Sequence, residues 1–481
     1  MSESTLLWFR LDLRLTDNPA LRATLCRGRP VIPVFIWSPE EEGRWEPGAA
    51  SRWWLHQSLT RLDASLRERG SRLIVRRGPA LPTIRALLEE SGATAVYWNR
   101  RYEPAVLDRD RHLKTALQED GRIAESFNSA LLFEPWTVRT KHGQPYRVFS
   151  AFWRACQAQT EPEPLQPAPQ TIESPPRWPA TIPLRELGLE PSLDRAGGLR
   201  SRWCPGEAGA LAALRRFLDE GLCGYSTGRD HPDRVRTSRL SPHLHFGEIG
   251  PRQVWSAVRG GQHGRSEAGR DYLRELGWRE FAHHLLFHFP YTPEQPLRQD
   301  FAAFPWEADE ANLRAWRRGR TGYPIVDAGM RELWQTGWMH NRVRMIAASF
   351  LVKDLLIPWQ EGAAWFWDTL VDADLANNTL GWQWTAGCGA DAAPYFRIFN
   401  PVSQGEKFDP SGDYVRRWVP ELDRLPNEWV HKPWGAPAGV LADAGVELGK
   451  HYPRPSVDHR EARARALEAL RRIKHLDAQL R

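Results

Sequence analysis

Side chains that can bind a base gather in the second half of the chain. Fifteen of the 24 tryptophans lie from Trp203 onward, and Trp278, Trp382 and Trp384 stand beside polar or charged residues. Aromatic faces next to cationic groups are the surfaces on which unstacked nucleic-acid bases bind. The pattern indicates a base-binding pocket, with core packing as the alternative for any single tryptophan.

Hydroxyl groups cluster just before one helical stretch. The segment from Thr237 to Ser241 carries three of them and precedes Pro242. Backbone amides in the first turn of a helix are unpaired and carry partial positive charge, so such a turn can hold a phosphate. Simple capping of the helix by Ser241 is the alternative interpretation.

Two carboxylates lie close together further along the chain. Asp372 and Asp374 are followed by Asn378. Both carboxylates would repel each other if they were buried without cationic or hydrogen-bonding partners. Arg344 is a candidate partner for them. The flanking apolar residues and asparagines favour a ligand-lining loop, whereas composition alone favours an exposed acidic turn.

The elements that must position these residues begin with an α/β region. In the first 130 residues, short apolar runs alternate with amphipathic stretches; the runs are 6–9, 31–37, 72–76, 94–98 and 122–127. This alternation predicts a doubly wound parallel five-stranded sheet. No GxGxxG or GxxxxGK(S/T) motif follows any of the runs, so a standard nucleotide phosphate cradle is not expected there.

The rest of the chain is predicted to be a long connection followed by helices. Residues 160–200 are rich in Pro, Glu, Ser and Thr, which disfavours long regular elements. We therefore expect an α/β domain at 1–130, a connection at 131–203 and an all-helical domain at 204–481. Helical periodicity recurs at 208–220, 251–258, 272–289, 310–318, 327–337, 343–354, 363–371 and 458–481.

Composition narrows the functional classes. A net charge of +6 over 481 residues is compatible with a polyanionic partner. No window approaches the ~18 consecutive apolar residues of a membrane span. The five cysteines are scattered, which disfavours disulfides and cysteine zinc sites and fits the cytoplasm. His284 and His288 are spaced like helical metal ligands, but the HExxH order is missing, so no metal site is predicted.

Several long segments together resemble the photolyase and cryptochrome family over essentially the whole chain, and within it the class I cyclobutane-dimer photolyases. The segments are LLWFRLDLRLTDNPAL, TSRLSPHLHFGEIGPRQVW, YLRELGWREFAHHLL, TGYPIVDAGMRELWQTGWMHNRVRMIAASFLVKDLL and GWQWTAGCGADAAPYFRIFNPVSQGEKFDP. The resemblance implies an N-terminal antenna domain, a long connection and a C-terminal helical domain that binds FAD.

The resemblance also carries flavin contacts over to this chain, position by position. These are Tyr225, Thr237, Ser238, Arg239, Leu240, Ser241, Tyr272, Arg279, Asn341, Arg344, Asp372, Ala373, Asp374 and Asn378. The hydroxyl cluster would then hold the FAD phosphates. The neutral amide of Asn378 would face N5 of the flavin ring, where it can hydrogen-bond without adding charge.

The implied activity is blue-light-driven repair of pyrimidine dimers in DNA, in which excited reduced FAD donates an electron to a flipped-out dimer. The implied substrate contacts are Arg229, Glu275, Trp278, Asn341, Arg342, Met345, Trp384, Arg397 and Gln404. Glu275, Met345 and Asn378 are assigned to the reacting centre. Trp306, Trp359 and Trp382 match the family's tryptophan chain, which photoreduces FAD. A monomer that binds dimer-containing DNA in the cytoplasm, without a membrane, is expected.

Three alternatives stay open. Plant-type cryptochromes share the fold but usually carry Asp at the position of Asn378 and a long tail. Enzymes that repair 6-4 photoproducts use a histidine pair around the positions of Asn341 and Met345, where this chain has no histidine. A plain flavin oxidoreductase is the third alternative, and it would have no use for a basic, aromatic substrate wall.

The identity of a second, antenna chromophore also stays open. The Asn-Glu pair of folate-binding members does not follow Tyr102-Glu103. A deazaflavin site would draw on Arg52 and residues near Trp37, but Arg101 stands where that pattern has an acidic group.

Overall fold

The computed structural model describes residues 4–159, 164–190, 196–391 and 396–480. The chain divides into two units, each assembled from separate stretches of sequence. The first unit contains Met1–Cys223, Ser238–Pro290 and Val371–Leu375, and the second contains Gly224–Thr237, Tyr291–Leu370 and Ala376–Arg481. The predicted domain boundaries after residues 130 and 203 stay predictions.

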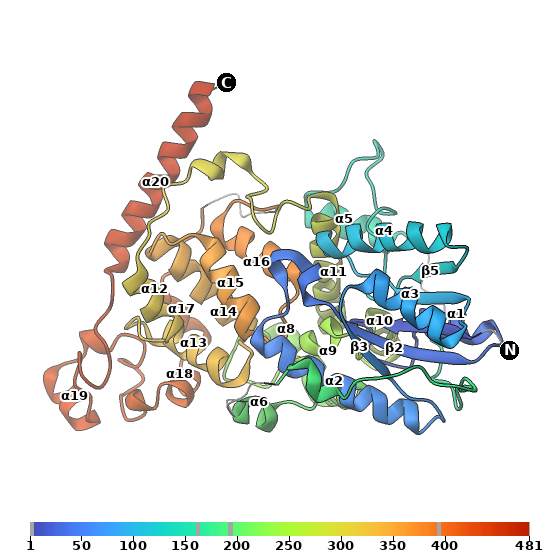
Figure 1. Ribbon diagram of the computed structural model, residues 1–481. Coiled ribbons are helices and arrows are strands. Elements are labelled where there is room, and N and C mark those ends of the chain that lie inside the picture. Colours follow the sequence, from blue (N-terminus) through green and yellow to red (C-terminus); the bar gives the residue numbers. More distant parts are fainter. Residues whose placement is uncertain (1–3, 160–163, 191–195, 392–395, 481) are drawn as a thin grey trace. The chain divides into compact units, whose positions relative to one another are not determined.

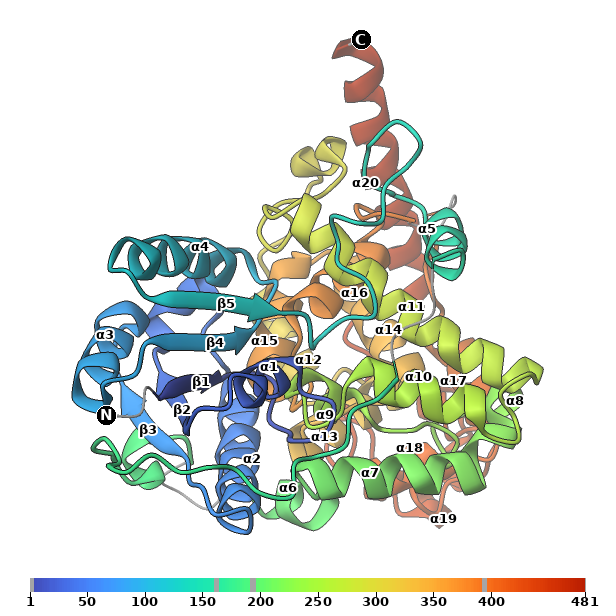
Figure 2. The same ribbon diagram turned by 90° about the vertical axis from the view of Figure 1, so that its right-hand side faces the viewer.

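A five-stranded parallel sheet forms the centre of the N-terminal region (Figure 2). Its strands are β1 (Thr5–Phe9), β2 (Val31–Trp37), β3 (Ile74–Arg77), β4 (Ala95–Asn99) and β5 (Ile123–Phe127), in the order β3-β2-β1-β4-β5. The register pairs Thr5 with Val31 on one side and with Ala95 on the other. The predicted α/β fold with five parallel strands is therefore confirmed.

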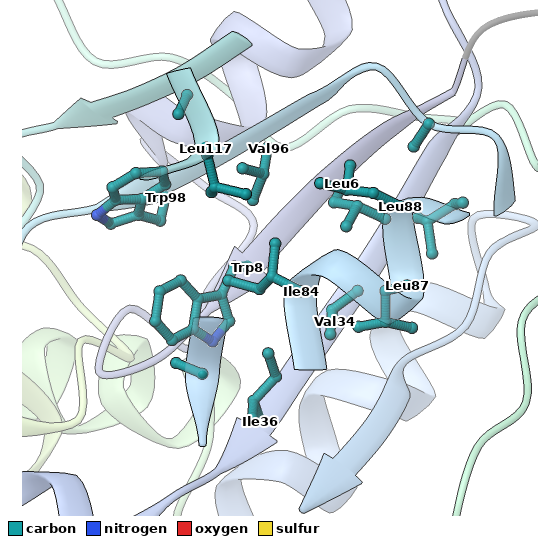
Figure 3. Packing of buried hydrophobic residues seen from close by; sticks show 14 of the residues in the cluster. Leu6, Trp8, Val34, Ile36, Ile84, Leu87, Leu88, Val96, Trp98 and Leu117 are labelled. Atoms are coloured by element: carbon teal, nitrogen blue, oxygen red, sulfur yellow. The ribbon is translucent and has the colours of Figure 1, made fainter. Parts of the chain in front are cut away.

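The core of the sheet explains why its strands are apolar almost without a break. Every residue of β1 and β2 is buried, as expected for parallel strands covered on both faces. On one face Trp8, Val34 and Trp98 pack against Ile84 and Leu117 (Figure 3). These two residues come from α3 (Ala80–Ser91) and α4 (Pro104–Glu119). Helix α1 (Pro19–Cys26) packs against β1 and β4.

The first unit adds further helices around this sheet. Helix α1 is capped by Asn18, whose side chain accepts a hydrogen bond from the Leu21 amide, and Pro19 occupies its first turn. The other helical segments are α2 (Ala49–Arg67), α5 (Phe149–Gln157), α6 (Gly197–Arg202), α7 (Glu207–Arg216), α9 (Ser241–His245), α10 (Pro251–Gly260), α11 (Glu267–His288), η1 (Pro39–Trp45), η2 (Leu184–Leu187) and the π-helical η3 (Phe217–Gly221).

The second unit is helical throughout its described part (Figure 1). Its segments are α8 (Tyr225–Gly228), α12 (Glu310–Arg317), α13 (Pro324–Thr336), α14 (Asn341–Ser349), α15 (Trp359–Thr369), α17 (Pro401–Phe408), α18 (Asp413–Trp418), α19 (Ala438–Ala444), α20 (His459–Leu480), η5 (Gln299–Ala303), η6 (Phe350–Asp354), η7 (Pro420–Leu422) and η8 (Pro433–Gly435). Two segments lie where the chain passes from one unit to the other, α16 (Leu375–Ala386) and η4 (Leu222–Gly224).

Two polar contacts inside the second unit fix the ends of its helices. Lys353 is 1% exposed, and its ammonium donates to the Ala386 carbonyl at the end of α16, at 2.7 Å. The same ammonium lies 2.9 Å from the centre of the Phe396 ring. At the next residue of η6, the buried carboxylate of Asp354 hydrogen-bonds His459, the first residue of α20. A lysine and a histidine therefore fasten α16 and α20 to the π-helical segment η6.

Candidate active site

Helix α11 presents an aromatic wall with a carboxyl group one turn away. Trp278 lies stacked on Phe149, with 3.7 Å between ring centroids and 8° between ring planes. Glu275 and Trp278 are three residues apart and so share a face of the helix. Both side chains are partly exposed. The sequence prediction that this helix offers an indole and a carboxyl together is compatible with this arrangement.

Helix α11 is also held by the connection that follows the sheet, through the two residues after Trp278. The Glu280 carboxylate accepts hydrogen bonds from the Leu132 and Phe133 amides, and Arg279 donates to the Ala130 carbonyl at 2.6 Å. The residues that looked like metal ligands therefore have structural partners, since His284 accepts from the Tyr146 amide. Among the described residues, no group of three His, Cys, Asp or Glu side chains is placed to hold a metal ion.

Asp374 sits between two histidines of the first unit. Its Oδ2 lies 3.6 Å from His245 Nδ1 and 3.4 Å from His283 Nε2. Burial would raise the pKa of Asp374, but His283, His245 and the more distant Arg279 hold that pKa well below its usual range. The site therefore contains a carboxylate that stays ionised. Sequence reasoning missed both histidines because they lie about a hundred residues before Asp374.

The segment around Asp372 is less irregular than predicted. Asp372 is 8% exposed and Ala373 2%, so the alternative of an exposed acidic turn is wrong. The predicted ligand-lining loop is short, because α16 begins at Leu375 and Asn378 therefore belongs to a helix. The Asn378 side-chain nitrogen donates to the Ala363 carbonyl at 3.0 Å. This bond uses one of the two N–H groups of the amide and fixes which side of the amide carries the oxygen, which is an acceptor.

The hydroxyl cluster lies where the chain passes between the units. In the first unit Ser238 hydrogen-bonds Tyr272, and Arg239 adopts a left-handed φ of 52° just before α9. Helix α9 is capped by Leu240 without a side-chain hydrogen bond, so the interpretation of Ser241 as the capping residue is wrong. Thr237 and Tyr225 belong to the second unit, where the Arg229 guanidinium lies 5.2 Å from the centre of the Tyr225 ring.

The first turn of α14 carries Arg342, whose contacts with described residues lie within the second unit. Arg342 Nη2 lies 2.8 Å from Asp230 Oδ1, and its guanidinium lies 4.5 Å from the centre of the Phe408 ring. We call Asp230, Arg342 and Phe408 the arginine cluster. It connects the predicted DNA-contact turn around Arg229 to α14 and to the end of α17. Asp230 and Phe408 were not predicted from the sequence, because they are remote from Arg342 along the chain.

The remaining predicted residues of the second unit lie on α14, α16, α17 and the segment before α17. Arg344 donates from Nε to the Met339 carbonyl at 2.7 Å. Trp384 lies on α16, Gln404 on α17 and Arg397 in the exposed segment before α17, while Asn341 and Met345 lie with Arg342 on the first turns of α14. These positions stay predictions as contacts with FAD or DNA.

The predicted tryptophan chain lies within the second unit. Trp382 contacts Phe366 at 5.0 Å and Trp316 at 6.2 Å between ring centroids, and its indole packs closely against Gly362. Trp359 is 2% exposed at the start of α15. Trp306 is partly exposed, and its ring centroid lies 4.4 Å from that of Phe304. The function of these three tryptophans in photoreduction of FAD stays a prediction.

Polar side chains at the carboxyl edge of the sheet, where α/β proteins usually bind ligands, hydrogen-bond one another. Asn99 donates to the Asp12 carboxylate at 2.6 Å and to Asn18 Oδ1 at 2.8 Å, while the buried Arg10 bonds Asp110 and the Asn99 carbonyl. We call Arg10, Asp12, Asn18 and Asn99 the edge network.

Beside the edge network, Arg101 pairs with two carboxylates. Its guanidinium lies 2.6 Å from Glu42 and 3.0 Å from Glu103. Burial would raise the pKa of Glu103, but Arg101 lowers it to about 2. Arg101, which disagreed with the deazaflavin pattern, thus has a structural function, and the antenna chromophore stays unidentified.

Comparisons with known proteins agree with this architecture. Residues 5–171 match the family model described as DNA photolyase, and residues 272–472 match the FAD binding domain of DNA photolyase. A deoxyribodipyrimidine photo-lyase of Agrobacterium fabrum is 51% identical over 471 residues, which are 98% of each chain. The chain belongs to the DNA photolyase and cryptochrome family.

This chain is also similar to a cryptochrome and to a class III photolyase of the same family. Cryptochrome-1 of Arabidopsis thaliana is 45% identical, over 98% of this chain and 71% of that protein. The crystal structure of a bacterial class III photolyase from Agrobacterium tumefaciens superposes with a TM-score of 0.95 at 50% identity, and covers 99% of this chain and 98% of that one.

These comparisons confirm the coarser predictions and leave the finer ones open. A photolyase-type enzyme with FAD as its cofactor and the predicted two-part fold is confirmed. The assignment to class I is not confirmed, because a class III photolyase matches at 50% identity. None of the helices in the described part of the chain is long and apolar enough to cross a membrane.

Proposed function

We propose that this chain repairs cyclobutane pyrimidine dimers in DNA under blue light. The observation that carries the proposal is the stacked Trp278–Phe149 pair with Glu275 one turn away on α11. A rigid, partly exposed aromatic face suits a flipped-out ring, because stacking tolerates any pyrimidine. The dimer has weakened pairing, so its extrusion from the duplex costs less than that of a normal base.

Glu275 and Trp278 would hold the dimer by different contacts, a hydrogen bond and stacking. Trp278 excludes water from one side of the ring and orients it. A pyrimidine edge carries both N–H donors and carbonyl acceptors, so the carboxyl group of Glu275 can hydrogen-bond it. A hydrogen bond aimed at the carbonyl where charge develops stabilises the electron-rich dimer while its bonds break. Phe149 holds the Trp278 indole in one orientation and thereby fixes the distance to Glu275.

The residues present fit FAD as the cofactor. The bond from the Asn378 nitrogen to the Ala363 carbonyl orients the amide, whose oxygen is an acceptor that suits an N–H donor of a reduced flavin. Ser238 and Tyr272 supply hydroxyls beside the left-handed turn at Arg239, where backbone amides can bind a phosphate. When bound, FAD supplies the light-driven electron that opens the dimer and takes it back afterwards.

Several finer features belong to the same proposal. The high similarity to a class III photolyase supports class III over the class I assignment that the sequence motifs suggested. Asn341 and Met345 are not histidines, which favours cyclobutane dimers over 6-4 photoproducts. We further propose that the enzyme acts as a monomer on DNA in the cytoplasm.

The test is repair of an oligonucleotide that contains one defined thymine dimer, under blue light and with the flavin chemically reduced beforehand. We expect the unmodified enzyme to repair it. Glu275→Ala should keep its FAD and lower both dimer affinity and repair yield, since a lost hydrogen bond to a developing anion costs about 2.7–4 kcal/mol in comparable sites. Glu267→Ala, at the exposed first turn of the same helix, is the matched control and should repair normally.

A light-sensing function is the second candidate, because the chain is 45% identical to Cryptochrome-1 of Arabidopsis thaliana. The same assay separates the two functions. An unmodified, FAD-loaded and pre-reduced protein that leaves the dimer intact would support sensing over repair. Undiminished repair by Glu275→Ala would leave the repair proposal standing but remove Glu275 from it.

A further inference from the structure

The Arg342 guanidinium is restrained on two sides within the second unit. Its Nη2 pairs with Asp230 at 2.8 Å, and one face of its plane lies on Phe408 at 4.5 Å. The Arg342 side chain is 18% exposed and that of Asp230 38%. The pair therefore lies at the surface, where a phosphate could still reach it, and not in a closed core.

Asp230 is a carboxylate among cations. Its chain neighbour Arg229 lies over Tyr225, and Lys407 lies 5.1 Å from the centre of the same Phe408 ring that Arg342 covers. The other acidic residue of this turn, Asp233, faces His231 and Arg234 instead. Asp230 is thus the carboxylate that faces Arg342, a residue that the proposed function assigns to a DNA phosphate.

We propose that Asp230 is a specificity-determining residue, which lowers binding to undamaged DNA and holds Arg342 in the orientation needed for dimer-containing DNA. This inference rests on the proposed function. In any DNA complex the carboxylate repels nearby phosphates and cancels part of the arginine charge. In the dimer complex, Arg342 must meet one defined phosphate, so holding it against Phe408 lowers the entropy cost of binding.

The two effects act in opposite directions on the two kinds of DNA. Non-specific binding depends on the number of free cations and not on their exact placement. Specific binding depends on placement as well. A repulsive group that costs affinity everywhere but improves positioning in one complex raises the ratio of the two affinities. Without Asp230, the enzyme should hold undamaged DNA more tightly and distinguish it less well from its substrate.

The experiment compares Asp230→Asn with the unmodified, FAD-loaded enzyme. Dissociation constants are measured in the dark for a duplex with one thymine dimer and for the same duplex without it, over a range of salt concentrations. Affinity for undamaged DNA should rise about two- to fivefold, the size of one exposed ion pair. Its salt dependence should steepen by about one unit of slope, because one more phosphate is neutralised. The ratio of dimer to undamaged affinity should fall by at least the same factor.

Two controls isolate the contact. Glu406→Gln removes the same charge from a similarly exposed carboxylate that pairs with Lys432, and it should leave the ratio unchanged. In an Arg342→Ala background, Asp230→Asn should no longer change the ratio, because the residue through which it acts is gone. Asp230→Glu keeps the charge and should restore most of the discrimination.

If the Asp230–Arg342 contact were purely structural, its removal would not make the enzyme bind undamaged DNA more tightly. The inference is overturned if Asp230→Asn leaves the ratio unchanged or raises it, or if its effect persists without Arg342. Those results leave the proposed function intact as long as the unmodified enzyme prefers and repairs dimer-containing DNA. If the unmodified enzyme shows neither preference nor repair, the proposed function and this inference fail together.

Discussion

The edge network of the first unit and the arginine cluster of the second each contain an arginine and an aspartate, but these side chains are buried in the first and partly exposed in the second. In the edge network, Asn99 places its donors on Asp12 and Asn18, and its residues are at most 4% exposed. In the arginine cluster, Arg342 has one ionic partner and one aromatic neighbour, and both members of the ion pair reach solvent. Polar groups satisfied by one another add rigidity, whereas partly satisfied surface donors remain available for a ligand.

The largest effect on the free energy of unfolding is expected from a substitution of Asn99 in the edge network. Asn99→Asp keeps the shape but replaces an amide donor with a carboxylate that faces the Asp12 carboxylate and the Asn18 oxygen. A buried group left against like charge costs about 3–5 kcal/mol, and we expect a loss of that size in the free energy of unfolding, measured in urea. Asn427→Asp is the control, because there the side-chain oxygen already accepts from Arg416, so little should change.

The next largest effect concerns Glu103 and depends on pH. Its folded-state pKa of about 2 lies below the ordinary value of 4.5. A lowered carboxyl pKa contributes stability above the unfolded value, and this contribution is lost as pH falls from about 4.5 towards 2. At pH 7 the contribution is at most about 3 kcal/mol. Urea unfolding should show Glu103→Gln less stable than the unmodified protein at pH 7, with the difference shrinking between pH 4.5 and pH 3.

A pH-independent difference between Glu103→Gln and the unmodified protein would mean that the Arg101 pair is not what sets the ionisation of Glu103. The Arg101–Glu103 pair beside the edge network would then contribute as little as the exposed ion pair of the arginine cluster, and the contrast between these two ion pairs would narrow.

The smallest effect is expected in the arginine cluster. Arg342→Ala removes a partly exposed ion pair, so the free energy of unfolding should change by less than about 1 kcal/mol. Its effect should fall on DNA binding instead, where the slope of log affinity against log salt should flatten by about one unit for one lost phosphate contact. Arg85→Ala removes an arginine paired with Asp120 on the first unit and serves as the charge control. Equal slopes in both variants would exclude Arg342 from the DNA footprint.

The strands were predictable because their signal is local. Runs of β-branched and aromatic residues bounded by turns marked all five, and the observed β2 has the predicted bounds of 31–37. Helix α16 escaped prediction for the opposite reason. Its sequence, LANNTLGWQWTA, carries two asparagines, a glycine and two tryptophans without an apolar stripe. The residues up to Asn378 were therefore predicted to belong to a loop. Tertiary packing against Ala363 and Gly362, and not propensity, makes it helical.

The site was predictable only as far as residues of one segment could show. The spacing of Glu275 and Trp278 placed them on one helical face, but nothing near them pointed to Phe149, which lies more than a hundred residues away. The same holds for Asp374 with His245, and for Arg342 with Asp230. Partners of this kind are chosen by the fold, since side chains remote in sequence meet only after the helices have packed. Arg344 was predicted from the sequence as the cationic partner of Asp372 and Asp374. The described partners of Asp374 are instead histidines.

Lys353 makes transient opening of the second unit measurable. Its amine is buried against Ala386 and Phe396, and burial lowers its pKa well below the usual range. An amine-reactive ester can label it only when this region separates and water enters. If opening and closing are faster than labelling, the labelling rate of Lys353 relative to that of the exposed Lys450 gives the fraction of molecules that are open. The labelling rate of Lys353 therefore measures how often its contact with the end of α16 opens.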